Sequence, residues 1–253
     1  MDQLRPLAED LIARNVAVIA AVGGNNAALT AKTLTSAIPI LFTSGVDPIK
    51  AGHVASLNRP EGNVTGVSWF SGELGNKHIE LLNELLPQAA LIALMVNPNN
   101  PEAGFYEKSA QDGVRAFGRR LLVVKAGTRG EIDAAFAMLA AERANAVIIA
   151  ADPFFPARAR QLAVLAARRG IPMIAAVREI TAAGGLISYG NSVTDAYRRL
   201  GVYAGRILKG AKPSDMPVDR AIKFELVINL GTAKALDIEI PPSVLARADE
   251  VIE

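Results

Sequence analysis

The chain has 253 residues, of which 51% are hydrophobic, and its 27 basic and 25 acidic side chains leave a formal net charge of +2. This length holds one large or two small domains, and the interleaved charges exclude a nucleic-acid-binding stripe and an acidic tail. The absence of cysteine excludes disulfides and thiolate chemistry. No apolar run reaches the about 20 residues that a membrane span needs.

Short apolar, β-branched runs alternate with helical patterns along the whole chain. The first 15 residues have the spacing of an amphipathic helix and lack the apolar core of a signal peptide, so we expect no export address there. The predicted strands are 16–21, 38–43, 64–69, 91–97, 121–125, 146–151, 172–177, 186–189 and 224–228. Such alternation predicts an α/β fold with parallel sheets and right-handed crossovers.

The intervening helices are bounded by capping residues. The predicted N-caps are Ser71, Asn100, Thr128 (in a capping box with Glu131), and either Ser192 or Thr194. The predicted stops are Pro87, Gly118 and Gly210.

Nine predicted strands fit two lobes better than one sheet. We expect a first lobe of residues 1–70 and 186–220, and a second lobe of residues 71–185 and 221–253. The chain is expected to cross between the lobes near 69–72, 183–185 and 216–224.

Polar residues follow the first two strands, at the positions where open α/β folds bind ligands. Gly24 and Asn25 open a helix whose free N–H groups can hold a carboxylate, although a plain tight turn with an Asn cap explains the same residues. Ser44, Gly45 and Asp47 supply a hydroxyl, a free N–H and a carboxylate after the second strand. Because Asp47 precedes Pro48, it also suits a helix cap, so both interpretations stay open.

Further candidates follow the strands of the second lobe. Asn97 can bond a polar ligand, but Asn-Pro turns also occur without one. Asp152 stands beside Phe154 and Phe155 in a chain that is only 5% aromatic. The carboxylate can pair with an ammonium group while a ring stacks on an apolar part of the ligand. The alternative is an N-cap with two core rings.

Three more residues have equally divided interpretations. Arg178 can clamp a carboxylate in bidentate fashion or form an ion pair between lobes. Trp69, the single tryptophan, can form the floor of a ligand cleft or only pack against the hinge. Tyr189 lies at a further strand tip, where it can face a ligand or pack.

Catalytic and metal motifs are missing from the sequence. The two histidines, His53 and His78, form no zinc-binding pattern, and there is no phosphate-binding loop and no nucleophile elbow. We therefore expect no metal, no cofactor and no enzymatic reaction.

Several phrases together resemble the ABC-transporter substrate-binding family of type I periplasmic binding proteins, the group that includes tryptophan- and tyrosine-uptake lipoproteins. They are IPILFTSGVDPIKAGHVASLNRPEGNVTGVS, ALMVNPNNPEA, ADPFF, REITAAGGLISYG, DAYRRLGVYAGRILKGAKPSDMP and the tail KFELVINLGTAKALDIEIPPSVLARADEVIE. The resemblance covers essentially the whole chain.

The resemblance implies two α/β lobes on a three-strand hinge that close on a small ligand, often an aromatic amino acid or a small aromatic carboxylate. It implies a monomer that delivers this ligand to a membrane permease, and a periplasmic or lipid-anchored location. The residues implied as ligand contacts are Ser44, Gly45, Asp47, Asn97, Asp152, Phe154 and Phe155.

One departure from the family pattern concerns the N-terminus. Members usually begin with a signal segment and a strand–helix–strand unit, whereas this chain starts at what resembles the helix before the third strand. We therefore expect an incomplete first lobe, weakened ligand binding, and an open edge on strand 16–21 that permits self-association.

Two other functions are compatible with such a fold. One is the effector-binding module of a regulatory protein, which a DNA-binding headpiece would identify. The other is a Rossmann-like enzyme, which would need a phosphate loop or an acid–base pair.

Overall fold

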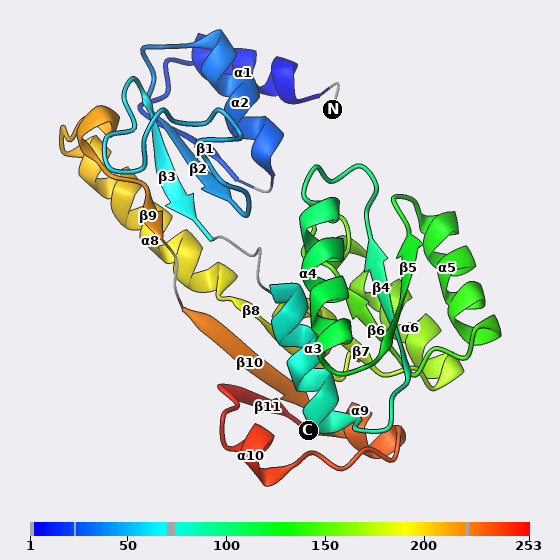
Figure 1. Ribbon diagram of the computed structural model, residues 1–253. Coiled ribbons are helices and arrows are strands. Elements are labelled where there is room, and N and C mark those ends of the chain that lie inside the picture. Colours follow the sequence, from blue (N-terminus) through cyan, green and yellow to red (C-terminus); the bar gives the residue numbers. More distant parts are fainter. Residues whose placement is uncertain (1–2, 23, 70–73, 221–222) are drawn as a thin grey trace. The chain divides into compact units, whose positions relative to one another are not determined.

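The chain divides into two compact units of helices and strands (Figure 1). This computed structural model describes residues 3–22, 24–69, 74–220 and 223–253. Unit 1 comprises Met1–Phe70 and Ser192–Lys223, and unit 2 comprises Ser71–Asn191 and Phe224–Glu253. In each unit helices flank a largely parallel sheet, which confirms the predicted α/β fold class. None of the described helices has the length and apolar character needed to cross a bilayer.

Unit 1 is built on a four-stranded parallel sheet in the order β1-β2-β3-β9. Its strands are β1 (Ile19–Ala21), β2 (Ile40–Ser44), β3 (Val64–Ser68) and β9 (Asp219–Arg220). Its helices are α1 (Leu4–Ala13), α2 (Asn25–Leu34), α8 (Val193–Leu208) and the 3-10 turn η2 (Pro213–Asp215). Only the last three residues of the predicted run 16–21 form β1, which lies at an edge of the sheet.

Strand β2 is buried over its whole length because both faces of the sheet are covered. Ile40 and Phe42 belong to the core cluster that includes Ala31 of α2. Leu41 points to the other face and belongs to the cluster that includes Leu200 of α8. This two-sided burial explains why Ile40–Phe42 are apolar in succession rather than alternating with polar residues.

Unit 2 is built on a seven-stranded sheet in the order β11-β10-β8-β7-β6-β4-β5, in which only β10 and β8 pair antiparallel. Its strands are β4 (Leu91–Val96), β5 (Arg120–Lys125), β6 (Ala146–Ile149), β7 (Met173–Ala175), β8 (Ile187–Asn191), β10 (Phe224–Asn229) and β11 (Glu250–Ile252). Its helices are α3 (Leu74–Leu85), α4 (Ala103–Ala116), α5 (Arg129–Ala141), η1 (Pro156–Arg158), α6 (Ala159–Arg169), α7 (Arg178–Ala182), α9 (Leu230–Ala235) and α10 (Pro242–Leu245).

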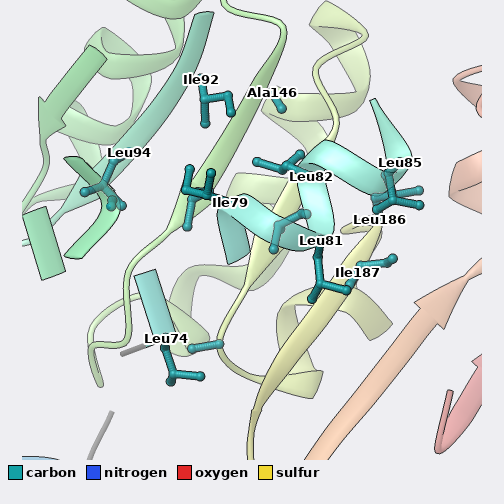
Figure 2. Close-up of a cluster of buried hydrophobic side chains, with 14 of the residues drawn as sticks. Leu74, Ile79, Leu81, Leu82, Leu85, Ile92, Leu94, Ala146, Leu186 and Ile187 are labelled. Carbon is teal, nitrogen blue, oxygen red and sulfur yellow. The ribbon is translucent and has the colours of Figure 1, made fainter. Parts of the chain in front are cut away.

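Strand β4, which lies between β6 and β5, shows how the sheet of unit 2 is covered on both faces. Ile92 and Leu94 lie in one core cluster, which includes Ile79 of α3 (Figure 2). Met95 lies in the other cluster, with Phe136 of α5. Burying each such large apolar side chain contributes about 1.5–3 kcal/mol. These two clusters hold the strand ends of unit 2 in place.

Two predicted helix caps are confirmed. The Thr128 hydroxyl accepts a hydrogen bond from the Glu131 N–H at 3.3 Å, and Ser192, rather than Thr194, accepts one from the Asp195 N–H at 3.2 Å. The predicted cap at Ser71 lies outside the described residues.

The helix predicted to begin after Asn100 starts later. Asn100 Oδ1 accepts a hydrogen bond from the Glu102 N–H at 2.9 Å, so it closes a turn, and α4 begins at Ala103. Strands β9 and β11 were not predicted because each is only two or three residues long and partly polar.

The division into units differs from the predicted lobes at residues 186–191. Strand β8 pairs with β7 and β10, so it belongs to unit 2. The turn at 183–185 consequently lies inside unit 2, between α7 and β8. Of the other predicted crossings, residues 70–72 and 221–222 lie outside the described residues.

Candidate ligand-binding site

In unit 1 the end of β2 meets the start of α2. The Ser44 hydroxyl donates to Asn25 Oδ1 at 3.0 Å and accepts from the Val46 N–H at 3.2 Å. Ser44 is 1% exposed. Its hydroxyl therefore joins the strand tip to the helix start, and its hydrogen bonds are made within unit 1.

His53 contacts both β2 and the start of α2. Its ring stacks on Phe42, with centroids 4.8 Å apart, and its Nε2 lies 3.0 Å from the Asn25 carbonyl oxygen. Burial lowers the pKa of His53. The neutral ring then donates from Nε2, while the buried Nδ1 has no partner among the described residues. His53 thus holds Asn25 in position.

Gly24 gives α2 an open N-terminus. Its backbone, at φ 150° and ψ 155°, adopts a conformation that is essentially restricted to glycine. As the N-cap it has no side chain to accept from the first helical N–H groups. Gly24 and Asn25 thereby offer N–H dipoles at the strand tip, the arrangement that suits an anion.

Trp69 and Asp47 complete the candidates of unit 1. A Cβ added at Gly45 would lie 3.0 Å from Trp69 Nε1, so the indole lies directly on the glycine backbone. Asp47 Oδ1 accepts from the Ile49 N–H at 2.9 Å and the Lys50 N–H at 3.3 Å. Asp47 therefore closes the turn that follows it, and the predicted role as a helix cap is wrong, because residues 48–52 form a turn and no helix.

In unit 2 the ends of β4 and β6 bring Asn97 and Asp152 together. Asp152 Oδ1 accepts from Asn97 Nδ2 at 3.1 Å and from the Phe154 N–H at 2.7 Å. Asn97 Oδ1 is itself bonded to the Asn99 N–H at 3.0 Å, which orients the amide. Asp152 is half-buried and forms no ion pair with any described residue. One oriented carboxylate thus stands at the joined strand tips.

The two neighbouring phenylalanines have different surroundings. Phe155 is fully buried in the core with Ile149 and Leu162, so it packs the unit rather than presenting a surface. Phe154 meets Phe155 edge to face at 5.3 Å and is half-buried. The Arg158 guanidinium lies 4.5 Å from the Phe154 ring centroid. Sequence reasoning missed Arg158, for which the four-residue spacing from Phe154 was the available signal.

Arg178 is paired within its own unit. Its Nε donates to Glu250 Oε2 at 2.6 Å and its Nη2 donates to Oε1 of the same carboxylate. This pairing raises the pKa of Arg178 and lowers the pKa of Glu250. The partner is on β11, so the bridge joins α7 to the sheet of unit 2.

Tyr189 is likewise engaged within unit 2. Its ring stacks on Phe224 at 5.4 Å, and its carbonyl oxygen lies 2.6 Å from Nε2 of His78. The other nitrogen of His78 lies 2.7 Å from the Tyr106 hydroxyl, which donates to it. Burial lowers the pKa of His78 to about 4. The neutral imidazole therefore joins α3, α4 and β8.

No cluster of potential metal ligands occurs in residues 3–22, 24–69, 74–220 and 223–253. The arrangement offers oriented dipoles in unit 1 and charged groups in unit 2. Oriented dipoles and charged groups of this kind can bind a small polar molecule reversibly.

Relatives of known sequence and structure share this fold. A curated tyrosine-binding protein from Clostridioides difficile strain R20291 is 28% identical over 216 residues, which cover 84% of this chain. The chain spans 61% of the length of that relative.

Two crystal structures superpose on nearly the whole chain with a TM-score of 0.87. A conserved domain protein from Vibrio cholerae is 26% identical, with 99% of this chain and 83% of that chain covered. An ABC domain from Streptococcus pneumoniae in complex with L-Trp is 24% identical, with 99% and 86% covered, and shows a shared fold. The family profile described as "ABC transporter substrate binding protein" matches residues 2–252. The chain therefore belongs to the family of ABC transporter substrate-binding proteins.

Proposed function

We propose that this chain is the solute-binding component of an ABC uptake transporter. It captures an amino acid or a small aromatic carboxylate and delivers it, as a monomer, to the membrane permease. Its place of action is the outer side of the cytoplasmic membrane, free in the periplasm or held by a lipid anchor. We expect no catalytic step, in keeping with a family description that names binding.

The geometry of Asp152 carries this proposal. Its carboxylate is oriented by Asn97 and by the Phe154 N–H, at the carboxyl ends of two parallel strands. Open α/β sheets bind ligands at such ends. A half-buried carboxylate that lacks an internal cation suits the ammonium group of an amino acid. The C. difficile relative named as tyrosine-binding supports an aromatic side chain on that ligand.

A regulatory effector-binding module has the same type of fold. The family profile favours transport, because it describes transporter proteins and matches residues 2–252. A regulator would be expected to bind its effector without stimulating uptake by a reconstituted permease, which separates the two functions.

A thermal-shift panel tests the proposal. L-tyrosine, L-tryptophan, L-leucine, 4-hydroxyphenylacetate and glucose are each added at millimolar concentration to the purified chain. A ligand at 100 times its Kd adds about 2.7 kcal/mol of stability and raises the melting temperature. We expect aromatic amino acids to raise the melting temperature. Without ligand, Asp152→Asn should melt at the wild-type temperature, but aromatic amino acids should no longer raise its melting temperature. A cooperative melt that no compound shifts would contradict the proposal.

A further inference from the structure

The half-buried Arg158 guanidinium has no anionic partner in the described part of the chain. It makes no ion pair there, and its buried Nε has no hydrogen-bond acceptor. Arg178, also in unit 2, differs because its guanidinium donates to both oxygens of the Glu250 carboxylate. Because the guanidinium is partly withdrawn from water and lacks a counter-ion, an anionic ligand would stabilise it.

Arg158 is held in place by an aromatic ring. Its guanidinium lies 4.5 Å from the centroid of Phe154, and Phe154 is braced edge-on by the fully buried Phe155. A stacked guanidinium is restricted in orientation, so less freedom is lost when it binds a planar anion. The ring therefore serves as a platform for the cation.

The backbone places Arg158 close to Asp152 in the same loop. The Phe155 N–H bonds to the Asp152 carbonyl oxygen at 3.4 Å, and the Arg158 N–H bonds to the Phe155 carbonyl oxygen at 2.8 Å. Two successive tight turns thus follow the end of β6. They carry one carboxylate and one guanidinium, each half-buried and neither ion-paired within the described residues.

Gln161, three residues after Arg158, is a neutral group with an oxygen that is unpartnered among the described residues. Gln161, on the first turn of α6, has a buried Oε1 without a donor, while its Nε2 bonds to the Arg129 carbonyl oxygen and to Asp133. An amide oxygen can accept a hydrogen bond, but it cannot neutralise a positive charge. Gln161 therefore supplies no counter-charge to the guanidinium.

We propose that Arg158 binds the carboxylate of the transported solute, while Asp152 binds its ammonium group. The proposal rests on the proposed function and deepens it, because it names the ligand as a zwitterionic α-amino acid read by one loop of unit 2. Bidentate pairing of a guanidinium with a carboxylate gives strength and orientation.

Three related probes separate the two charges. L-tyrosine carries both groups, tyramine lacks the carboxylate, and 3-(4-hydroxyphenyl)propionate lacks the ammonium group. Affinities are measured by calorimetry for the wild type, Arg158→Gln and Asp152→Asn, with Arg160→Gln as the matched control. Arg160 is an exposed arginine two residues away on α6.

We expect Arg158→Gln to weaken L-tyrosine and the propionate by about 10- to 100-fold and to leave tyramine unchanged. Asp152→Asn should weaken L-tyrosine and tyramine and leave the propionate unchanged. Arg160→Gln should bind all three like the wild type, and Arg158→Lys should restore part of the carboxylate affinity.

Two results would overturn the role of Arg158 alone. The first is a wild type that binds L-tyrosine while Arg158→Gln binds it equally well. The second is an equal loss of all three probes in Arg158→Gln, which would assign the arginine to packing on Phe154. A wild type that binds none of the probes would instead contradict the proposed function together with this inference.

Discussion

The strand tips of the two units satisfy their polar groups in different ways. In unit 1, Ser44 bonds to Asn25 and to a neighbouring N–H, and Asp47 caps its own turn. In unit 2, Asp152 and Arg158 are half-buried charges without ionic partners in the described residues. The polar groups at this strand tip of unit 1 are thus satisfied within the unit, whereas the strand tip of unit 2 carries the two charges that we propose as ligand contacts.

Each unit contains one histidine, and the two rings have similar environments. His53 stacks beneath the corner of unit 1, and His78 joins three elements of unit 2. Both rings are buried, and burial lowers both pKa values. In each unit a neutral imidazole therefore joins neighbouring elements through hydrogen bonds, although the strand tips of the two units differ.

The largest effect should come from a methyl group placed where each sheet needs a glycine. A Cβ at Gly66 of unit 1 would lie 2.1 Å from the Phe42 carbonyl oxygen, and one at Gly190 of unit 2 would lie 1.9 Å from that of Ala176. We expect Gly66→Ala and Gly190→Ala each to lower the free energy of unfolding by about 3 kcal/mol. Urea unfolding followed by circular dichroism and Trp69 fluorescence measures this loss.

Gly201 provides the control, because a Cβ there meets nothing within 4 Å. Gly201→Ala should stabilise α8 by about 0.5–1 kcal/mol. Wild-type stability in either sheet variant would show that the close strand contacts are not needed.

The next effect concerns pH and compares the two histidines. The pKa of His78 falls from 6.5 to about 4 on folding, so the folded chain favours the neutral ring. This stabilisation is complete above pH 6.5 and is lost as the pH falls through 4, a change of about 3 kcal/mol. We expect His78→Gln to be less stable at pH 7 and to lose most of this pH dependence in urea unfolding.

His53→Gln is the matched variant from unit 1. It should retain the part of the slope that His78 causes. A wild-type stability that is constant between pH 7 and 4 would contradict the assignment of both rings as neutral.

A smaller effect tests whether the Ser44 hydroxyl is consumed within unit 1. Ser44→Ala removes its hydrogen bonds to Asn25 and Val46 and should cost about 1 kcal/mol of unfolding free energy. The affinity for L-tyrosine should change far less than in Arg158→Gln. A tenfold loss of affinity at unchanged stability would place Ser44 in contact with the ligand and remove the contrast between the units.

The smallest effect is expected at the paired arginine of unit 2. Arg178→Gln breaks an exposed ion pair with Glu250 and should cost less than about 1 kcal/mol. Calorimetry should give a wild-type affinity for L-tyrosine. A weakened affinity would mean that Arg178 leaves Glu250 to bind the ligand. That result would contradict the assignment of ligand binding to Arg158 rather than to the paired Arg178.

Local features of the sequence were predictable because they depend on neighbouring residues. The cap at Thr128 bonds a backbone group three residues away, and the continuous apolar run of β2 reports burial on both faces. The family phrases and the polar residues after each strand also pointed to strand-tip binding. The fold class thus follows from short-range patterns, and the strand-tip site stays a prediction.

Only the tertiary structure decided which of those residues are engaged and with what. Phe154 and Phe155 are adjacent and identical in type, yet the packing around Ile149 sends one ring into the core and leaves the other beneath Arg158. Arg178 finds its carboxylate 72 residues away, on a strand too short to predict. Composition and spacing report local hydrogen bonds and burial, whereas the pairing of charges depends on where the backbone brings distant segments together.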